Sequence, residues 1–324
     1  WIGFSMEIGP AGNLYVLDWH DADICGNSVR QKETGRIFMI RPSESQAEEW
    51  KGRYQDLSTF SDLELAKLQI SSSDWHSRRA RLILQARSTT RAIDSQAVQF
   101  LDETLKSSNR VDFRLRALWS MQITNQASTS WLIKQLEDKE PYVRGWAVQF
   151  LCEDKNPDTE VLAKMSEMAV NETSPIVRLY LAAALQRIPE AARWEIVNGL
   201  LTHQQDSADH NIPKMIWFGF EPLVIKDPDR SLKFAVDSKI PLVAEFIVRR
   251  LVDANQLEGV VASLQKRSSN QRRMLDGLLA SLEGRSDLQA PDNWAAVYKN
   301  LSRNEETATV ALAVAQQFGD SEAA

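Results

Sequence analysis

Asp18, His20 and Asp21 are residues whose types and close spacing could support chemistry at one place. They follow residues 14–17, a short apolar run with the composition of a β-strand. Two carboxylates and an imidazole at a strand end could hold a ligand or a metal ion. They could equally organise a loop, because aspartate side chains often accept hydrogen bonds from nearby backbone N–H groups. We interpret the three as candidate site residues, with the loop role as the alternative.

The histidines and cysteines are too widely spaced for the common metal and haem motifs. They are His20, His76, His203, His210, Cys25 and Cys152. No two histidines form HxxxH or HExxH, and neither cysteine lies in CxxC or CxxCH. We therefore predict no catalytic residue, no metal site and no bound cofactor within this sequence.

His210 and Glu221 are the remaining candidates, in a segment whose proline pattern differs from the rest of the chain. Pro213 can begin a helix, whereas Pro222 lacks the N–H that would bond to residue 218, so we expect a kink or an end near Phe220. The two candidates would lie about 16 Å apart along one straight helix, so direct contact is not expected. Glu221 needs another partner, such as an arginine. We interpret the segment as a rigid joint between the two halves of the solenoid, with a binding site as the alternative.

Net charge limits the classes of partner. The 324 residues carry a formal charge of −6, with a pI of about 5.4. This opposes nucleic-acid binding through neutralised phosphates. Residues 73–116 depart from the average, with nine basic and five acidic side chains, and could dock an acidic partner. A solvated helix face with internal ion pairs is the alternative. The basic residues are Arg78, Arg79, Arg81, Arg87, Arg91, Lys106, Arg110, Arg114 and Arg116.

Composition and ends of the sequence give further expectations. Hydrophobic residues make up 43% and charged residues 25%, which is typical of a globular protein. No apolar run is long enough to span a membrane. The sequence begins with Trp1, and we expect it to be part of a longer polypeptide.

Two kinds of hydrophobic periodicity divide the chain. Residues 4–8, 14–17 and 36–40 read as three strands of a β-meander, which is too small to be stable alone and should contact the helices or further sequence. From residue 43 the period becomes helical, with capping residues at Ser61, Ser73 and Asp94. We predict two parts: a β-meander over residues 1–42 and helices over residues 43–324.

The helical part repeats one pattern, Val-Arg-x-x-Ala-x-x-x-Leu, which is clearest at Arg144, Ala147 and Leu151. Related copies begin at Ser77, Arg114 and Arg178. A period of roughly 30–40 residues is typical of stacked helical hairpins. We predict a mainly α protein: a HEAT/armadillo-like α-solenoid with a short N-terminal β-meander. The small residue allows close helix approach and the arginine can reach a carboxylate or a helix end, so we expect a structural role for both.

Tryptophan is abundant, with ten residues. Their helical spacing favours core or groove positions over a platform for stacked bases. This interpretation covers Trp119, Trp131, Trp146 and Trp194.

Two stretches resemble one protein family. Residues 12–21 with 35–40 resemble the last blade of a sugar-dehydrogenase-like β-propeller, with its pattern G-x-L-Y-V-x-D-W-x-D followed by G-R-I-x-R-I; Met39 stands where that pattern has arginine. Residues 211–224 and 238–243 resemble the helical region of the same proteins. These are bacterial membrane-bound-dehydrogenase-like proteins with a propeller, HEAT repeats and a C-terminal CxxCH haem domain.

The resemblance implies a non-catalytic helical scaffold in the periplasm or cell envelope. Its partners would be other proteins, or the propeller and haem domains of the same chain. Because CxxCH is absent from these residues, the redox chemistry of that family cannot be placed on them. The alternatives are a HEAT-like DNA glycosylase, which the acidic net charge opposes, and a protein-binding solenoid without redox partners.

We expect the purified 324-residue chain to give a blank pyridine haemochrome assay, because it lacks a CxxCH attachment motif. A c-type haem spectrum that survives denaturation would contradict this expectation.

Overall fold

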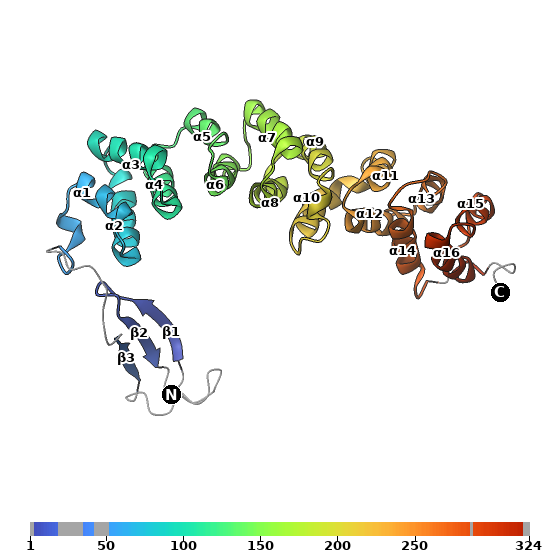
Figure 1. Cartoon of the computed structure of the whole chain (residues 1–324), viewed down its shortest axis with the longest axis horizontal. Coiled ribbons are helices and arrows are strands. Elements are labelled where there is room, and N and C mark those ends of the chain that lie inside the picture. The colour runs from blue at the N-terminus through green and yellow to red at the C-terminus, as the bar shows by residue number, and fades with distance from the viewer. Residues whose placement is uncertain (1–2, 19–34, 42–51, 286–287, 320–324) are drawn as a thin grey trace. The chain divides into compact units, whose positions relative to one another are not determined.

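The computed structural model describes residues 3–18, 35–41, 52–285 and 288–319 (Figure 1). Within these residues the chain is mainly helical, with one small antiparallel sheet. It divides into two compact units, Trp1–Trp131 and Leu132–Ala324, and each is described by itself.

The sheet of the first unit has three strands in the order β1 (Gly3–Ile8), β2 (Leu14–Asp18) and β3 (Arg36–Ile40). These confirm the predicted strands to within one residue. The turn between β1 and β2 needs Gly12, whose φ of 74° is a left-handed conformation that glycine adopts without strain. Arg53 reaches this turn from the helical side, and its Nε donates to the carbonyl oxygen of Pro10 at 3.2 Å.

Strand register gathers apolar side chains on one face of the sheet. Met6, Val16 and Phe38 are direct cross-strand neighbours. Ile8, Leu14 and Ile40 form the next set of cross-strand neighbours on the same face. Neighbours on one face of adjacent strands pack against each other, so the face is apolar across all three strands. Its members are Met6, Ile8, Leu14, Val16, Phe38 and Ile40. We refer to it as the first sheet face, and to the face that carries Leu17, Ile37 and Met39 as the second sheet face.

Predicted capping residues begin the helices of the first unit. Ser61 forms a capping box with Glu64, and the side chains of Ser73 and Asp94 accept hydrogen bonds from the first turns of the next two helices. Such caps satisfy N–H groups that have no partner inside the helix. The helices are η1 (Leu57–Thr59), α1 (Asp62–Lys67), η2 (Leu68–Ile70), α2 (Asp74–Ser88), α3 (Ser95–Ser107) and α4 (Val111–Ile123).

Helical hairpins continue along the chain after α5 (Thr129–Gln135), which contains the division between the units. In the second unit, even-numbered helices from α6 to α16 pack in order against one another, and so do α7 with α9 and α11 with α13. The helices are α6 (Pro141–Leu151), α7 (Thr159–Asn171), α8 (Pro175–Ala184), η3 (Leu185–Arg187), α9 (Glu190–Leu200), η4 (Gln204–Asp206), α10 (Ile212–Val224), α11 (Pro228–Asp237), α12 (Pro241–Asp253), α13 (Leu257–Ser263), α14 (Gln271–Leu282), α15 (Trp294–Leu301) and α16 (Glu305–Gln317).

Arginines of the repeat pattern connect successive hairpins. Arg144 of α6 donates to both carboxylate oxygens of Glu172, at 2.9 and 2.6 Å. Arg178 of α8 does the same with Asp206, at 2.6 and 2.5 Å, and also donates to the carbonyl oxygen of Glu172 at 2.9 Å. Burial alone would raise the pKa of Glu172, but the hydrogen bonds from Arg144 and from the backbone of Ser174 outweigh it and lower that pKa.

Arg114, the first of the three pattern arginines along the chain, donates to a different kind of acceptor. Arg114 is buried in α4, and its Nε donates to the carbonyl oxygen of Leu105 near the end of α3, at 2.6 Å. A cation at the last turn of a helix also interacts favourably with the helix dipole. In all three helices the arginine therefore connects its helix to a neighbouring element, as the pattern predicted.

Of the two expectations for Pro222, the helix end near Phe220 is wrong, whereas the kink stays a prediction. Pro222 does not end the helix near Phe220: α10 continues from Ile212 to Val224 with Pro222 inside it. The proline leaves the carbonyl of Phe218 without its helical donor, but the Phe218 side chain is 57% exposed, so that part of the helix faces solvent. The neighbouring carbonyl, of Gly219, accepts from Arg193 at 3.1 Å. The segment lies inside the second unit, and its role as a joint between the two halves of the solenoid stays a prediction.

Ala147 tests the register of the repeat. Its side chain is fully buried in α6, where the pattern requires a small residue. We expect Ala147→Glu to lower the free energy of unfolding by at least about 2 kcal/mol, because it forces a carboxylate into the helix interface. Urea unfolding followed by circular dichroism measures this change.

Ala163→Glu is the matched control, because Ala163 is an exposed alanine of α7 in the same unit. We expect this control to change stability by no more than about 0.5 kcal/mol. Equal effects of the two substitutions would show that the register is incorrect.

Candidate functional site

Asp18, the first candidate from the sequence, lies buried at the end of β2. It pairs with Arg36, its cross-strand neighbour on β3, through contacts of 3.0 Å to Nη2 and 3.2 Å to Nε. An ion pair in register between strands stabilises the sheet. His20 and Asp21 lie outside the described residues.

His210 and Glu221 occupy different surroundings. His210 is exposed before α10, and its Nδ1 lies 3.1 Å from Oδ1 of the adjacent Asn211. Glu221 lies on α10 and forms an ion pair with Arg250 of α12, with 2.5 Å between Oε1 and Nε. The partner that the sequence required for Glu221 is therefore an arginine, and it ties α10 to α12.

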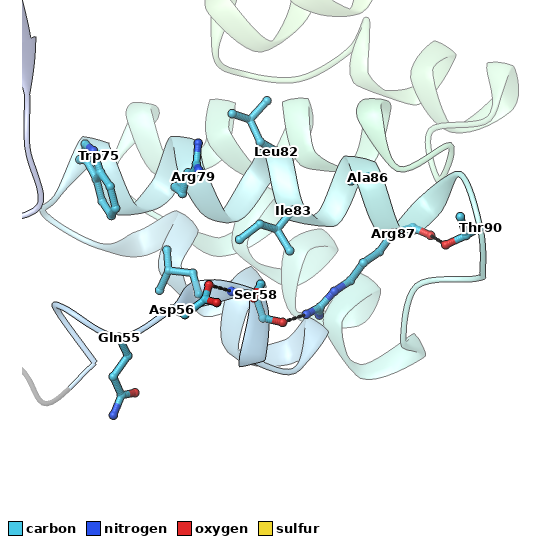
Figure 2. Close-up of a pocket in the computed structure, with 11 residues that line it drawn as sticks. Gln55, Asp56, Ser58, Trp75, Arg79, Leu82, Ile83, Ala86, Arg87 and Thr90 are labelled. Carbon is cyan, nitrogen blue, oxygen red and sulfur yellow. Dashed lines mark hydrogen bonds between the residues drawn. The ribbon is translucent and has the colours of Figure 1, made fainter.

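A surface groove follows the outer side of α2 and is our candidate site (Figure 2). It has a volume of about 620 Å³ and lies between α2 and residues 55–58, which include the start of η1. Figure 2 shows Trp75 and Ile83 directed toward this segment, whereas Leu82 points away from it. Its lining residues are Gln55, Asp56, Leu57, Ser58, Trp75, Arg79, Leu82, Ile83, Ala86, Arg87 and Thr90.

Asp62 fixes the wall of this α2 groove. This carboxylate at the start of α1 is buried and accepts from Arg87 at 2.7 Å, from Arg91 at 2.6 Å and from the backbone N–H of Asp94 at 3.1 Å. Arg87 also donates to the carbonyl oxygen of Ser58 at 2.7 Å, which joins α2 to the opposite wall. The hydrogen bonds from Arg91, and next those from Arg87, hold the pKa of Asp62 well below its usual value despite burial.

Arg79 gives the α2 groove a positive charge that is available to a ligand. Its side chain is exposed, and among the described residues no carboxylate lies within 4.0 Å of its guanidinium. Asp56, the carboxylate that lines the same groove, accepts from the backbone N–H of Ser58 at 2.9 Å. That hydrogen bond lowers the pKa of Asp56 most, and the charge of Arg79 adds a smaller effect.

A second hollow, of about 690 Å³, adjoins the first. Trp75, Arg79 and Leu82 line both, and Met6 and Ile8 of β1 line the second. The exposed apolar surface thus continues from α2 toward the sheet.

The basic region predicted at residues 73–116 is largely neutralised by internal contacts. Arg78, Lys106 and Arg110 form ion pairs with aspartates two or four residues away. Arg116 pairs with Asp74 at 3.2 Å and donates to the carbonyl oxygen of Ser71 at 2.8 Å. The alternative of a helix surface with internal ion pairs therefore describes most of this region; Arg81 instead donates to Gln69 at 3.3 Å, and Arg79 is exposed with no carboxylate of the described residues within 4.0 Å.

A smaller hollow between α2 and α4 brings tryptophan and aspartate together, as a base-binding enzyme would require. Arg81 stacks on Trp119 with 5.2 Å to the ring centroid, which occupies the aromatic face. Asp74 and Asp112, which line the hollow, both form ion pairs with arginines. Paired carboxylates and a covered ring do not favour general-base or base-stacking chemistry here.

The described residues show neither a metal-binding cluster nor a membrane-spanning helix. Within them no group of three or more His, Cys, Asp or Glu side chains is arranged to hold a metal ion. None of the helices among the described residues is long and apolar enough to cross a membrane.

Comparison with known proteins gives little information. No protein-family model and no curated protein matches the chain. Among solved structures, an engineered protein is similar over 80% of this chain and 78% of its own, with 15% identity and a TM-score of 0.33. A designed armadillo repeat protein is similar over 79% of this chain and 99% of its own, with 13% identity and a TM-score of 0.23. The repeat architecture therefore rests on the helix pairs of the chain itself.

Sequence reasoning grouped Arg79 with the basic residues but did not identify the groove around it. A signal was present: Trp75, Leu82 and Ile83 form an apolar stripe on α2 in addition to the one that contains Ala80 and Leu84. A helix with two apolar stripes has more such surface than one contact needs.

Asp62→Asn should lower the stability at pH 7 by about 2 kcal/mol, because it weakens two charged hydrogen bonds at a buried position. The folded pKa of Asp62 is lowered, so its contribution is complete above the unfolded value of about 3.9 and is lost as the pH falls below it. The difference in the free energy of unfolding between Asp62→Asn and the natural chain should therefore shrink as the pH is lowered from about 4 to about 3, just below the unfolded pKa. Urea unfolding at each pH measures this difference.

Asp292→Asn serves as the control, since Asp292 is an exposed aspartate. It should change stability little at either pH. A pH-independent loss for Asp62→Asn would show that the carboxylate charge does not stabilise this wall.

Proposed function

We propose that the chain is a non-catalytic scaffold that holds a larger β-sheet assembly next to further protein domains. The observation that carries this proposal is a set of exposed apolar side chains on both faces of the sheet; on the second face they come from β2 and β3, since β1 contributes Ser5 and Glu7 there. On the first sheet face, Met6 is 68% exposed and Ile8 57% exposed; on the second, Ile37 is 69% exposed. Contiguous exposed apolar surface usually marks an interface.

A sheet with exposed apolar side chains on both faces fits a position between other sheets. Both faces of a propeller blade are covered by its neighbours, whereas a sheet that packs on one side only has one polar face. This supports a β-propeller as the assembly to which the three strands belong. The resemblance of residues 12–21 and 35–40 to a last propeller blade points the same way.

The helical part suits a scaffold because its charged pattern residues contact other parts of the repeat. Arg114, Arg144 and Arg178 hold adjacent helices together and are not available to a substrate. Helical repeats present extended surfaces to other proteins. We therefore infer that this part binds protein partners and separates domains rather than performs catalysis.

The finer proposal follows from the family resemblance. The parent would be a dehydrogenase-like protein of the periplasm or cell envelope, with a propeller before the helices and a CxxCH haem domain after them. DNA glycosylase activity is not favoured, since the net charge is −6 and the carboxylates beside Trp119 are paired with arginines. A protein-binding repeat without redox partners is the outcome if the haem test below fails.

Methionine oxidation of the native polypeptide that contains this chain tests the proposal. Met6 and Met39 lie on opposite faces of the sheet and are 68% and 44% exposed, so hydrogen peroxide should oxidise both in the 324-residue chain. In the native polypeptide, purified with antibodies against this chain, both should be protected. Met165 and Met274 are fully buried and should stay unoxidised in both samples.

The outcomes separate the two levels of the proposal. If either exposed methionine stays reactive in the native polypeptide, that face is uncovered and the blade assignment is wrong. A positive pyridine haemochrome assay on the same sample would support the dehydrogenase-like parent. A blank assay would contradict that parent while leaving a scaffold in place.

A further inference from the structure

The α2 groove has the side-chain spacing of a helix-packing face. Trp75, Arg79 and Ile83 follow one another at intervals of four residues, and Leu82 and Ala86 each lie three residues after one of them, so the five lie along one broad side of α2 with Leu82 at its edge away from η1. The opposite stripe of the same helix already packs into the first unit. α2 therefore carries a second surface, which η1 borders on one side and which no other helix among the described residues lines.

Other helices of the chain show what fits such a face. α4 packs against α2, and in the second unit α8, α10, α12, α14 and α16 each pack against the even-numbered helix before them. The contacts are close: a Cβ added at Gly219 of α10 would come within 2.3 Å of Cβ of Leu185. In the α2 groove the small side chain of Ala86 likewise permits close approach by a backbone. The shape therefore suits another helix.

Charge narrows the chemistry of that helix. Arg87 is bound to Asp62 and to the carbonyl oxygen of Ser58, and Asp56 accepts from the backbone N–H of Ser58 through one carboxylate oxygen. Arg79 has no carboxylate within 4.0 Å among the described residues and lies between Trp75 and Ile83 along α2. An occupant that buries the apolar side chains should bring a carboxylate to Arg79, because an unpaired cation is costly to cover.

We propose that the α2 groove binds an amphipathic α-helix of a partner protein, through apolar contacts with Trp75, Leu82 and Ile83 and through one Asp or Glu opposite Arg79. This deepens the scaffold function and rests on its protein-binding part only. It requires neither the propeller nor the haem domain, so its test and the methionine test fail independently.

Selection from a phage-displayed library of 16-residue helical peptides tests the proposal, with the natural chain as the target and Leu82→Asp as the counter-target. We expect enriched peptides to be amphipathic and to share an acidic residue at one position of the apolar stripe. The best peptide, synthesised with a fluorophore, is then titrated in its Glu form and in its Lys form. The Glu form should bind the natural chain about fivefold more tightly or better, which is the scale of one partly exposed charge pair.

Charge reversal provides the decisive comparison. Arg79→Glu should invert the preference, so that the Lys form binds more tightly than the Glu form. Arg249→Glu is the control, since Arg249 is an exposed arginine on α12 outside the groove, and it should leave both affinities unchanged. Arg79→Ala, which should abolish the preference, replaces Arg79→Glu if circular dichroism shows that the latter is unfolded.

Three results would overturn the proposal. One is a selection that yields no peptide sensitive to Leu82→Asp, or only extended proline-rich sequences. Another is equal affinity of the Glu and Lys forms for the natural chain. The third is a dimer in sedimentation that Leu82→Asp converts to a monomer, because a second copy of the chain would then cover the groove.

Discussion

The rest of the helical structure depends on burying charged arginine side chains together with their partners. Arg178 and Asp206 are almost completely buried, and each loses its hydration on folding. The pair is tolerated because both oxygens of the carboxylate are bound by the planar guanidinium, and a backbone carbonyl takes a further donor. Arg144 and Glu172 repeat the arrangement at the same sequence separation of 28 residues. The two pairs therefore fix how one hairpin registers on the next.

This constraint also determines which surfaces are left for function. The arginine and carboxylate side chains that connect successive hairpins are not available to a ligand. Most cations of residues 73–116 are similarly bound to nearby aspartates or carbonyls. The binding potential of the described residues is therefore concentrated where packing is incomplete. These places are the two faces of the sheet and the α2 groove, where Arg79 remains exposed beside Trp75 and Leu82.

Local signals in the sequence predicted most of the fold, because caps and periodicity act over a few residues. Ser61, Ser73 and Asp94 begin helices as expected. Pro222 suggested a helix end that is not observed, since the cost of a proline depends on whether solvent reaches the carbonyl that it leaves free, which is a tertiary property. The candidate site was harder for the same reason. The role of Asp18 becomes clear only when the strand register places it opposite Arg36. The groove along α2 exists because part of that helix surface is left unfilled by other elements, which the sequence of α2 alone does not show.

The two kinds of uncovered surface differ in a way that separates their roles. Most of the exposed side chains on the sheet faces are apolar. Such surfaces resemble obligate interfaces, whose partners are not stable as separate proteins. The α2 groove mixes apolar side chains with an exposed arginine that water solvates well while the groove is empty. A surface of this composition tolerates both the free and the bound state, so its partner can exchange. Under the proposed function, one permanent and one exchangeable contact would let the scaffold keep a β-sheet assembly in place while it recruits another protein.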